Sequence, residues 1–237
     1  MKTIRILILT LGALVCAPHA VKAQGLEANI GADIVSRYIW RGQELGGVSF
    51  QPSMGISAWG LSLSAWGNVG ISNFQDTKEL DLTLAYSIGG FNIGVTDYWF
   101  DSGPEPDALY FNYTAGSTNH IFEANVGYDF GFLAIQWYTN FAGNDAIAPN
   151  GKLAFSSYAE LTVPFKIGPT EWSFAAGVVP FATEFYAADR FSLVNLSLTA
   201  SIDIPITDRF SLPVYTTLAT NPLTRQAFLL VGITLHP

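Results

Sequence analysis

Apolar and polar residues alternate one by one along most of the chain after residue 26, which is the period of a β-strand with one apolar face. Residues 33–42 show this pattern, with Tyr38 and Trp40 on the apolar face and an aromatic-Arg-Gly turn at the end. The charged residues of the stretch all fall on the opposite face: Asp33, Arg37 and Arg41. The pattern therefore predicts a half-buried strand that enters a loop at Gly42.

Twelve such strands can be marked along the chain. They are predicted at 27–41, 48–58, 61–71, 80–88, 91–100, 119–129, 133–140, 153–164, 172–179, 191–204, 210–219 and 226–235. Connections after even-numbered strands are mostly short, and those after odd-numbered strands are mostly longer and polar. The tight turns are Trp59-Gly60, Gly89-Gly90 and Phe130-Gly131. The strands are therefore expected to run antiparallel, with the tight turns together at one end.

Two architectures fit such strands, a soluble sandwich and a closed membrane barrel. Bacterial outer-membrane barrels have an even strand number, short turns at one end, longer loops at the other, and aromatic girdles at both rims. Aromatic residues gather near the tight turns (Trp59, Phe91, Phe130, Phe132, Phe165, Trp172, Phe210) and near the long connections (Tyr38, Trp40, Trp99, Phe100, Trp137, Phe141). The prediction is an all-β, closed antiparallel transmembrane β-barrel of twelve strands, and 10 to 14 strands are compatible with the pattern.

The composition favours the membrane barrel. Charged residues make up 13% of the chain, about half the usual share, and aromatic residues make up 14%. After the N-terminal segment no apolar run reaches the roughly 18 residues of a spanning helix, because the run at 227–235 has only nine. Insertion into a membrane would therefore require strands.

The first 23 residues have the form of a secretory signal peptide. Lys2 and Arg5 precede an apolar run at 6–17, and small residues stand before Gln24. Lipidation of Cys16 is disfavoured by its bulky neighbour Val15. Removing 23 of the 237 residues leaves 214, so residues 24–237 are expected to form a single barrel domain in the bacterial outer membrane.

Several kinds of chemistry are disfavoured in the exported part of the chain. It has no cysteine, and its 8 basic and 19 acidic residues give a net charge of −11, which is unsuited to nucleic acid. His120 and His236 are its only histidines, so no multi-histidine metal site can form. We expect no cofactor, no metal and no catalytic residues, with outer-membrane lipid and small solutes as the partners.

The charges on the polar faces are the main candidates for a functional site. They are expected to project into one enclosed space: Asp33, Arg37, Arg41, Asp81, Glu123 and Glu160. One interpretation is a set of ion pairs that satisfies a crowded interior, and the other is a constriction that selects solutes, as charged rings do in pores. In both, Tyr38 and Trp40 are expected at the outer rim, facing lipid.

The width of the barrel bears on whether a channel is open. Twelve strands at the usual spacing and tilt give a backbone radius of about 12 Å. Small inward residues such as Ser62, Ser64 and Ser197 favour a water-filled lumen. The long connection at 101–118 could fold inward and plug it.

Three segments carry a family resemblance. Tyr38-Ile39-Trp40-Arg41-Gly42, the hairpin through Trp59-Gly60-Leu61, and Glu79-Leu80-Asp81-Leu82 resemble the Tyr-x-Phe-Arg-Gly and Glu-x-Asp-Leu segments of the TorF-type porin family of bacterial outer-membrane barrels. The likeness covers residues 33–129, with Trp40 where the family has Phe and no Tyr-Pro-Gly segment around 100–103. It implies an outer-membrane barrel in which Tyr38, Trp40, Arg41 and Gly42 form the family-like motif.

Four functions remain open on the sequence. The first is a porin that passes small hydrophilic solutes through a narrow polar lumen, and the second is a closed barrel that displays loops or stabilises the envelope. The third is a lipid-acting barrel enzyme that uses His120 with a serine and an acid, although a catalytic triad is defined by geometry. The fourth is a soluble periplasmic β-protein.

Overall fold

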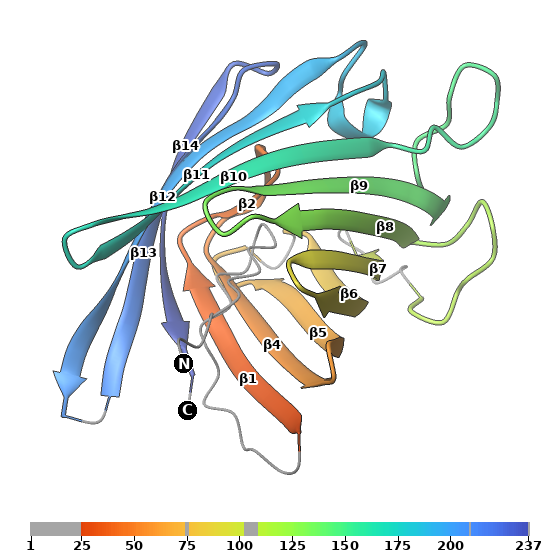
Figure 1. Ribbon diagram of the computed structural model, residues 1–237. Coiled ribbons are helices and arrows are strands. Elements are labelled where there is room, and N and C mark those ends of the chain that lie inside the picture. Colours follow the sequence, from red (N-terminus) through yellow and green to blue (C-terminus); the bar gives the residue numbers. More distant parts are fainter. Residues whose placement is uncertain (1–24, 74–75, 102–108, 209, 237) are drawn as a thin grey trace.

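The computed structural model describes residues 25–73, 76–101, 109–208 and 210–236. Within these residues twelve strands close into one antiparallel β-barrel (Figure 1). The wall strands are β1 (Leu26–Val35), β4 (Ser49–Ala58), β5 (Leu61–Gly70), β6 (Lys78–Ile88), β7 (Phe91–Asp101), β8 (His120–Asp129), β9 (Ala134–Gly143), β10 (Ser157–Ile167), β11 (Thr170–Val179), β12 (Ser192–Thr207), β13 (Phe210–Asn221) and β14 (Gln226–Leu235). The prediction of a closed twelve-stranded antiparallel barrel is confirmed.

Each wall strand pairs with its neighbours in sequence order, and β14 pairs with β1 to close the ring. The tight turns join β4 to β5, β6 to β7 and β10 to β11, so they define a turn end of the barrel. The longer connections lie at the opposite, loop end, as the sequence predicts. The predicted turn at 205–209 begins inside β12, which continues to Thr207 with a register shift after Pro205.

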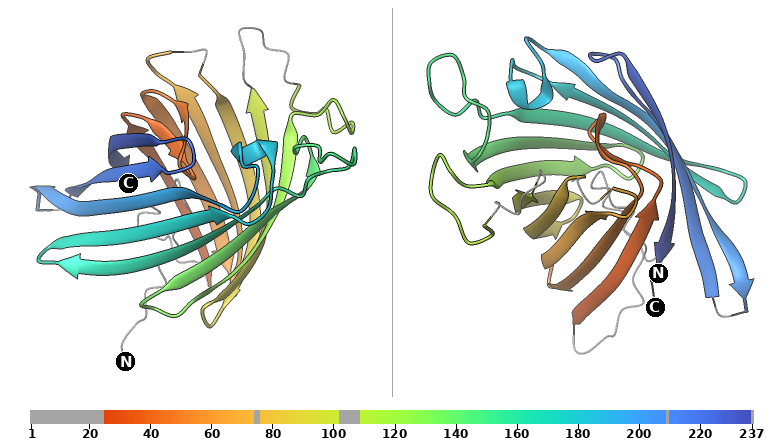
Figure 2. Two further views of the ribbon diagram at one scale, coloured as in Figure 1. Left: turned by 90° about the horizontal axis from the view of Figure 1, so that it is seen from above. Right: turned by 180° about the vertical axis from the view of Figure 1, so that it is seen from behind.

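β1 pairs with its two neighbours in the closed ring over different lengths. β1 pairs with β4 over all ten of its residues, but with β14 only over 32–35. β12 and β13 project beyond β14 at the turn end and diverge from β1 (Figure 2). The barrel is therefore closed by a short ladder, which joins the loop-end part of β1 to the turn-end part of β14.

The alternation places apolar side chains on the outside of the wall and polar ones inside. Large outward residues with substantial exposure stand in register on neighbouring strands, such as Leu63 beside Leu84 and Leu84 beside Val95. Inward positions on the same strands hold polar groups, and Thr83 hydrogen-bonds Thr96 there. This is an inverted arrangement relative to a soluble protein, because the enclosed space is polar and the exposed surface is apolar.

The first predicted strand is longer than the wall strand that forms. β1 ends at Val35, bends follow at Ser36 and Arg37, and the chain then forms a short hairpin of β2 (Tyr38–Trp40) and β3 (Gln43–Gly46). Arg41 and Gly42 join these strands with φ values of 48° and 77°, as a two-residue hairpin turn requires. We call residues 38–46 the inner hairpin, because they lie inside the ring of wall strands (Figure 1).

Little else interrupts the all-β fold. A single-turn 3-10 helix, η1 (Glu184–Tyr186), lies in the connection between β11 and β12 at the loop end. No helix in the described ranges is long and apolar enough to cross a membrane. The predicted signal peptide at 1–23 lies outside the described residues.

Candidate functional site

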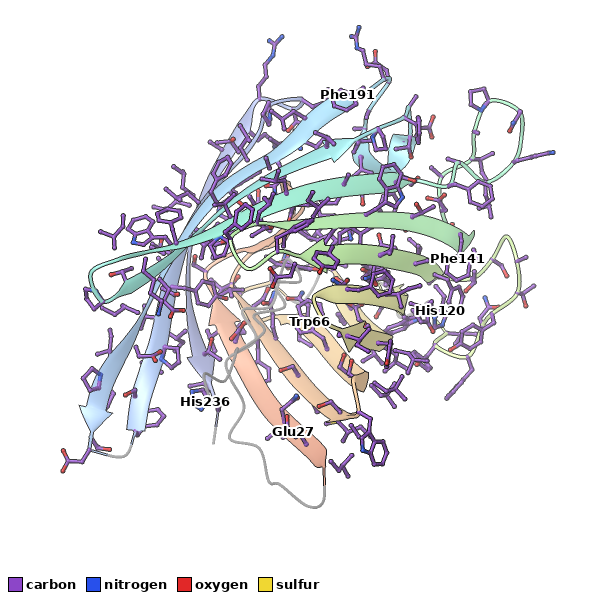
Figure 3. All side chains as sticks on the ribbon, in the orientation of Figure 1. Glu27, Trp66, His120, Phe141, Phe191 and His236 are labelled. Atoms are coloured by element: carbon purple, nitrogen blue, oxygen red, sulfur yellow. The ribbon has the colours of Figure 1, made fainter. Side chains whose placement is uncertain are left out.

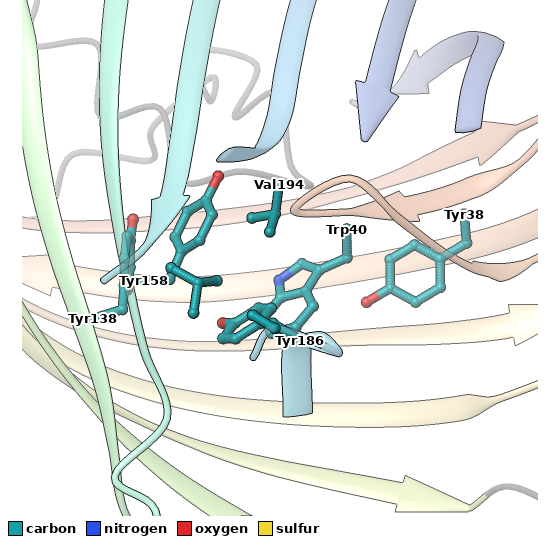
Figure 4. Close-up of a cluster of buried hydrophobic side chains, with 8 residues drawn as sticks. Tyr38, Trp40, Tyr138, Tyr158, Tyr186 and Val194 are labelled. Carbon is teal, nitrogen blue, oxygen red and sulfur yellow. The ribbon is translucent and has the colours of Figure 1, made fainter. Parts of the chain in front are cut away.

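The inner hairpin contacts several sides of the barrel wall. The hydroxyl of Tyr38 donates to Glu79 on β6 at 2.7 Å, and the side chain of Asn221 on β13 donates to the carbonyl of Gly42 at 3.2 Å. Figure 4 shows Tyr38 and Trp40 lying among side chains of the wall and of η1. The hairpin therefore fills the interior of the barrel near the loop end.

Arg41, at the tip of the hairpin, is the charged centre of this packing. Its two terminal nitrogens donate to the two carboxylate oxygens of Glu123 at 2.6 and 2.9 Å. Nη1 also donates to the hydroxyl of Tyr186 on η1 at 2.6 Å, and Tyr98 donates to Glu123 at 2.8 Å. This bidentate pairing is the strong form of an arginine–carboxylate contact.

Three aromatic rings surround the same guanidinium. Its central carbon lies 4.4 Å from the ring centroid of Trp40, 4.1 Å from that of Tyr138 and 4.7 Å from that of Tyr158. These distances are within the range of cation–π attraction, which strengthens when water is excluded. Arg41 is 2% exposed, so no water-filled path runs along its head group.

The charge on Arg41 is retained despite this burial. Burial is the largest single effect and lowers the pKa of the guanidinium, but Glu123, Tyr186 and Tyr98 together raise it further, so the pKa lies well above its usual value. A buried ion pair gains little net stability over an apolar pair, yet loss of one partner leaves the other charge buried and costs about 3–5 kcal/mol. The contact therefore determines where the hairpin can sit.

Glu79 and Asp81 form a second acidic group on the inner face of β6. Their carboxyl groups hydrogen-bond one another, and Glu79 also accepts the hydroxyl of Tyr38. A hydrogen bond between two carboxyl groups needs a proton on one of them. The other carboxylate oxygen of Asp81, Oδ1, is buried without a partner in the described structure.

The remaining two predicted lumen carboxylates, Glu160 and Asp33, lie on different wall strands, β10 and β1. Glu160 on β10 accepts hydrogen bonds from Tyr158 and Asn195, and Tyr158 in turn packs on Arg41. Asp33 is held by the hydroxyl of Tyr215 at 3.5 Å, rather than by an arginine. The structure thus divides the predicted charge cluster into separate hydrogen-bonded groups.

One predicted orientation is wrong, and Arg37 lies apart from the other predicted lumen charges. It stands at the bend after β1, where it is 44% exposed and pairs with Glu44. Tyr38 and Trp40 do not face lipid at an outer rim, because they are 3% and 8% exposed inside the barrel. The physical reason is the end of the wall strand at Val35, after which the alternation continues in the hairpin.

Sequence reasoning missed the tyrosines of the site. Tyr98 and Tyr138 alternate with apolar residues and so fall on the polar face of their strands, which was the available signal. Tyr158 also occupies an inward position, and its ring covers Gly177 on β11 so closely that a Cβ there would lie 1.8 Å from the hydroxyl oxygen. Tyr186 lies in a loop without periodicity, so nothing in the sequence pointed to it.

His120 lies on the outer face of the barrel at the loop end of β8 (Figure 3). Its Nδ1 is 2.7 Å from Oδ1 of Asp97, and its Nε2 is 2.5 Å from the carbonyl oxygen of Tyr110. Tyr113 stacks on the ring at 4.2 Å. Asp97 falls on the apolar face of β7, and this contact gives its carboxylate a partner there. Among the described residues no serine hydroxyl contacts either ring nitrogen of His120.

The connection at 101–118 was expected to be able to plug the lumen. Its residues 102–108 lie outside the described part. The described part packs over His120 on the outer wall, where Leu109 and Phe111 are exposed. Among the described residues, the inner hairpin lies in the interior of the barrel.

We expect His120→Ala to destabilise the loop end of the barrel. The change leaves the Asp97 carboxylate without its partner at a largely buried site, at a cost of about 3–5 kcal/mol. The midpoint of denaturant unfolding in detergent measures the loss. The double variant His120→Ala/Asp97→Asn should recover part of it, since both partners of the contact are then replaced and no carboxylate is left without its partner. Equal losses in the single and double variants would contradict this explanation.

No group of three or more His, Cys, Asp or Glu side chains that could hold a metal occurs within the described ranges. The inner-face groups described above are hydrogen-bonding and charged side chains. What this arrangement can do is bind cations and polar solutes, or obstruct their passage.

Comparison with known proteins adds little to this geometry. No protein-family model matches the chain, and no curated protein matches it. Among solved structures, a porin matches at 16% sequence identity over 80% of this chain and 62% of the porin chain, with a TM-score of 0.39. The chain therefore spans less than two thirds of that porin. The assignment of a closed barrel rests on the strand pairing, and the resemblance to the TorF-type porin family stays a prediction.

Proposed function

We propose that this protein is an outer-membrane barrel that passes small hydrophilic solutes through its lumen, and that the inner hairpin controls the passage. The proposal rests on which part of the chain fills the lumen. The wall encloses a polar space, and near the loop end a separate two-stranded hairpin fills it together with side chains of the wall and of η1.

The outer surface supports a membrane location. Aliphatic side chains that would be buried in a soluble protein are exposed around the wall, for example Ile30, Met54, Leu84 and Leu229. Exposed apolar surface on this scale marks an interaction with lipid or protein. Aromatic residues such as Trp59 at the turn end are exposed, as expected of an interfacial girdle.

The inner surface supports conduction. Ser64 on β5 is exposed on the inner face, and other inward hydroxyls toward the turn end, such as Ser62 and Ser201, are half-buried. Small hydroxyl side chains leave room for water and solutes. We infer that a passage through the whole barrel opens when the inner hairpin moves away from its contacts with the wall and with Tyr186 of η1, while the wall hydrogen bonds stay in place.

The completeness of the packing around Arg41 favours a second candidate, a permanently closed structural barrel. The bidentate pair, the third hydrogen bond and the three rings contact the guanidinium on its edge and on its faces. In that case the hairpin would be a fixed plug.

Planar-bilayer recording separates these candidates. The wild-type protein is compared with a variant in which residues 38–46 are replaced by Gly-Ser-Gly, which keeps the pairing of Val35 with Ser49. We expect steady conductance from the shortened variant and brief openings of the same amplitude from the wild type. A wild-type barrel that stays silent while the shortened variant conducts would establish the closed barrel instead.

A further inference from the structure

The surroundings of Arg41 are complementary to a guanidinium group as such. A carboxylate binds its edge through two hydrogen bonds, a phenol accepts a third, and aromatic rings cover its faces. A free flat organic cation would need these same contacts. We call Glu123, Tyr138, Tyr158 and Tyr186 the cation box.

The occupant and the cation box belong to different parts of the fold. Arg41 lies on the inner hairpin, whereas Glu123, Tyr138 and Tyr158 project from the neighbouring wall strands β8, β9 and β10. Pairing between these strands does not involve the hairpin. If the hairpin moves away, the three wall residues of the box stay in position.

The electrostatics of the vacated box would favour a cation. Arg41 is the only buried lysine or arginine in the described chain, so its departure leaves Glu123 uncompensated. Glu160 lies one tyrosine away, through Tyr158, and Asp81 interacts electrostatically with Glu123. An excess of carboxyl groups in an enclosed site attracts cations and repels anions.

We propose that the cation box binds solutes that carry a guanidinium or a similar flat organic cation, and that Arg41 is the chain's own occupant, which such a solute displaces. The evidence for the cation box is the set of contacts that Arg41 makes. The role of the box in selecting solutes rests on the proposed pore function. Binding and opening are then linked, because a solute in the box competes with the closed position of the hairpin.

A rescue experiment tests the box without relying on conduction. Arg41→Ala empties the box and leaves Glu123 buried, so the variant should unfold at a lower temperature than the wild type. Millimolar methylguanidinium should raise that temperature toward the wild-type value by binding the folded state. Methylurea, which has a similar planar shape but no charge, is the matched probe and should have no effect at the same concentration.

Two control variants locate the effect. Arg37→Ala, which removes an exposed arginine of the same stretch, should show no shift with methylguanidinium. Arg41→Ala/Glu123→Gln should bind methylguanidinium about tenfold more weakly or worse, because a hydrogen bond to a charged group is replaced by one to a neutral amide. Equal shifts with methylguanidinium and methylurea, or equal shifts in all variants, would overturn the cation box.

A second measurement uses the wild-type protein, and so does not depend on the folding of Arg41→Ala. In planar bilayers, methylguanidinium should increase the fraction of time spent open several-fold over NaCl of equal ionic strength. Rescue without any conductance would support the box and overturn the pore. Conductance that methylguanidinium leaves unchanged, without rescue, would support the pore and overturn the box.

Discussion

Arg41→Ala is expected to raise the open fraction of the barrel about a hundredfold. In the closed position the variant leaves Glu123 buried without its cation, which costs about 3 kcal/mol or more, whereas in the open position water solvates the carboxylate. Each 1.4 kcal/mol changes an equilibrium tenfold, so the closed state loses about two orders of magnitude of its population advantage. Single-channel recordings at fixed voltage measure the open fraction.

The matched control is Arg37→Ala. Both arginines belong to the same short stretch, but Arg37 forms an exposed pair with Glu44, and such pairs contribute about 0–1 kcal/mol. Its open fraction should stay within about fivefold of the wild-type value. Similar open fractions in the two variants would mean that the pair of Arg41 with Glu123 does not hold the hairpin closed.

Gly42→Ala is expected to prevent the inner hairpin from taking its closed position. A Cβ on residue 42 would lie 2.0 Å from the backbone carbonyl oxygen of Val194 on β12, and that backbone belongs to the wall. The φ of 77° adds about 1–2 kcal/mol of strain for a residue with a side chain. Residue 42 takes no part in wall pairing, so the barrel should still fold and conduct like the hairpin-shortened variant.

Trypsin cleavage gives a second readout of this change. Arg41 is 2% exposed in the closed structure, so cleavage after it should be slow in the wild type and fast in Gly42→Ala. Gly131→Ala is the control, because Gly131 has a similar φ of 85° but open space around it. If Gly131→Ala increased cleavage after Arg41 as much, general loosening rather than the clash would be the cause.

The alternation of apolar and polar residues determined that the chain forms the wall of a barrel. A strand in a wall with different surroundings on its two faces must alternate, so the period of two reveals both the strand and its orientation. This is why the inward positions of Asp33, Asp81, Glu123 and Glu160 could be predicted on β1, β6, β8 and β10. The glycine turns likewise predicted which strand ends meet, since positive φ values are needed there.

The same reasoning failed for residues 36–46. A hairpin inside the barrel alternates in the same way as a wall strand, so Tyr38 and Trp40 gave the same pattern in either place. What separates the two is the set of contacts that the tip makes, and these come from far along the chain, since Arg41 bonds residues 82 and 145 positions away. Periodicity is a local property and carries no information about such partners.

The sequence by itself thus determined the antiparallel barrel with twelve as the predicted strand number, the two faces of the wall and the aromatic-Arg-Gly turn at residues 40–42, because each of these follows from local backbone geometry and local burial. Only the tertiary structure decided that this turn lies inside the barrel, that Arg41 rather than Arg37 is the buried cation, and that Asp97 is paired with His120. Those outcomes depend on which polar groups from distant strands can satisfy a buried charge, and that is settled when the ring of strands closes around them.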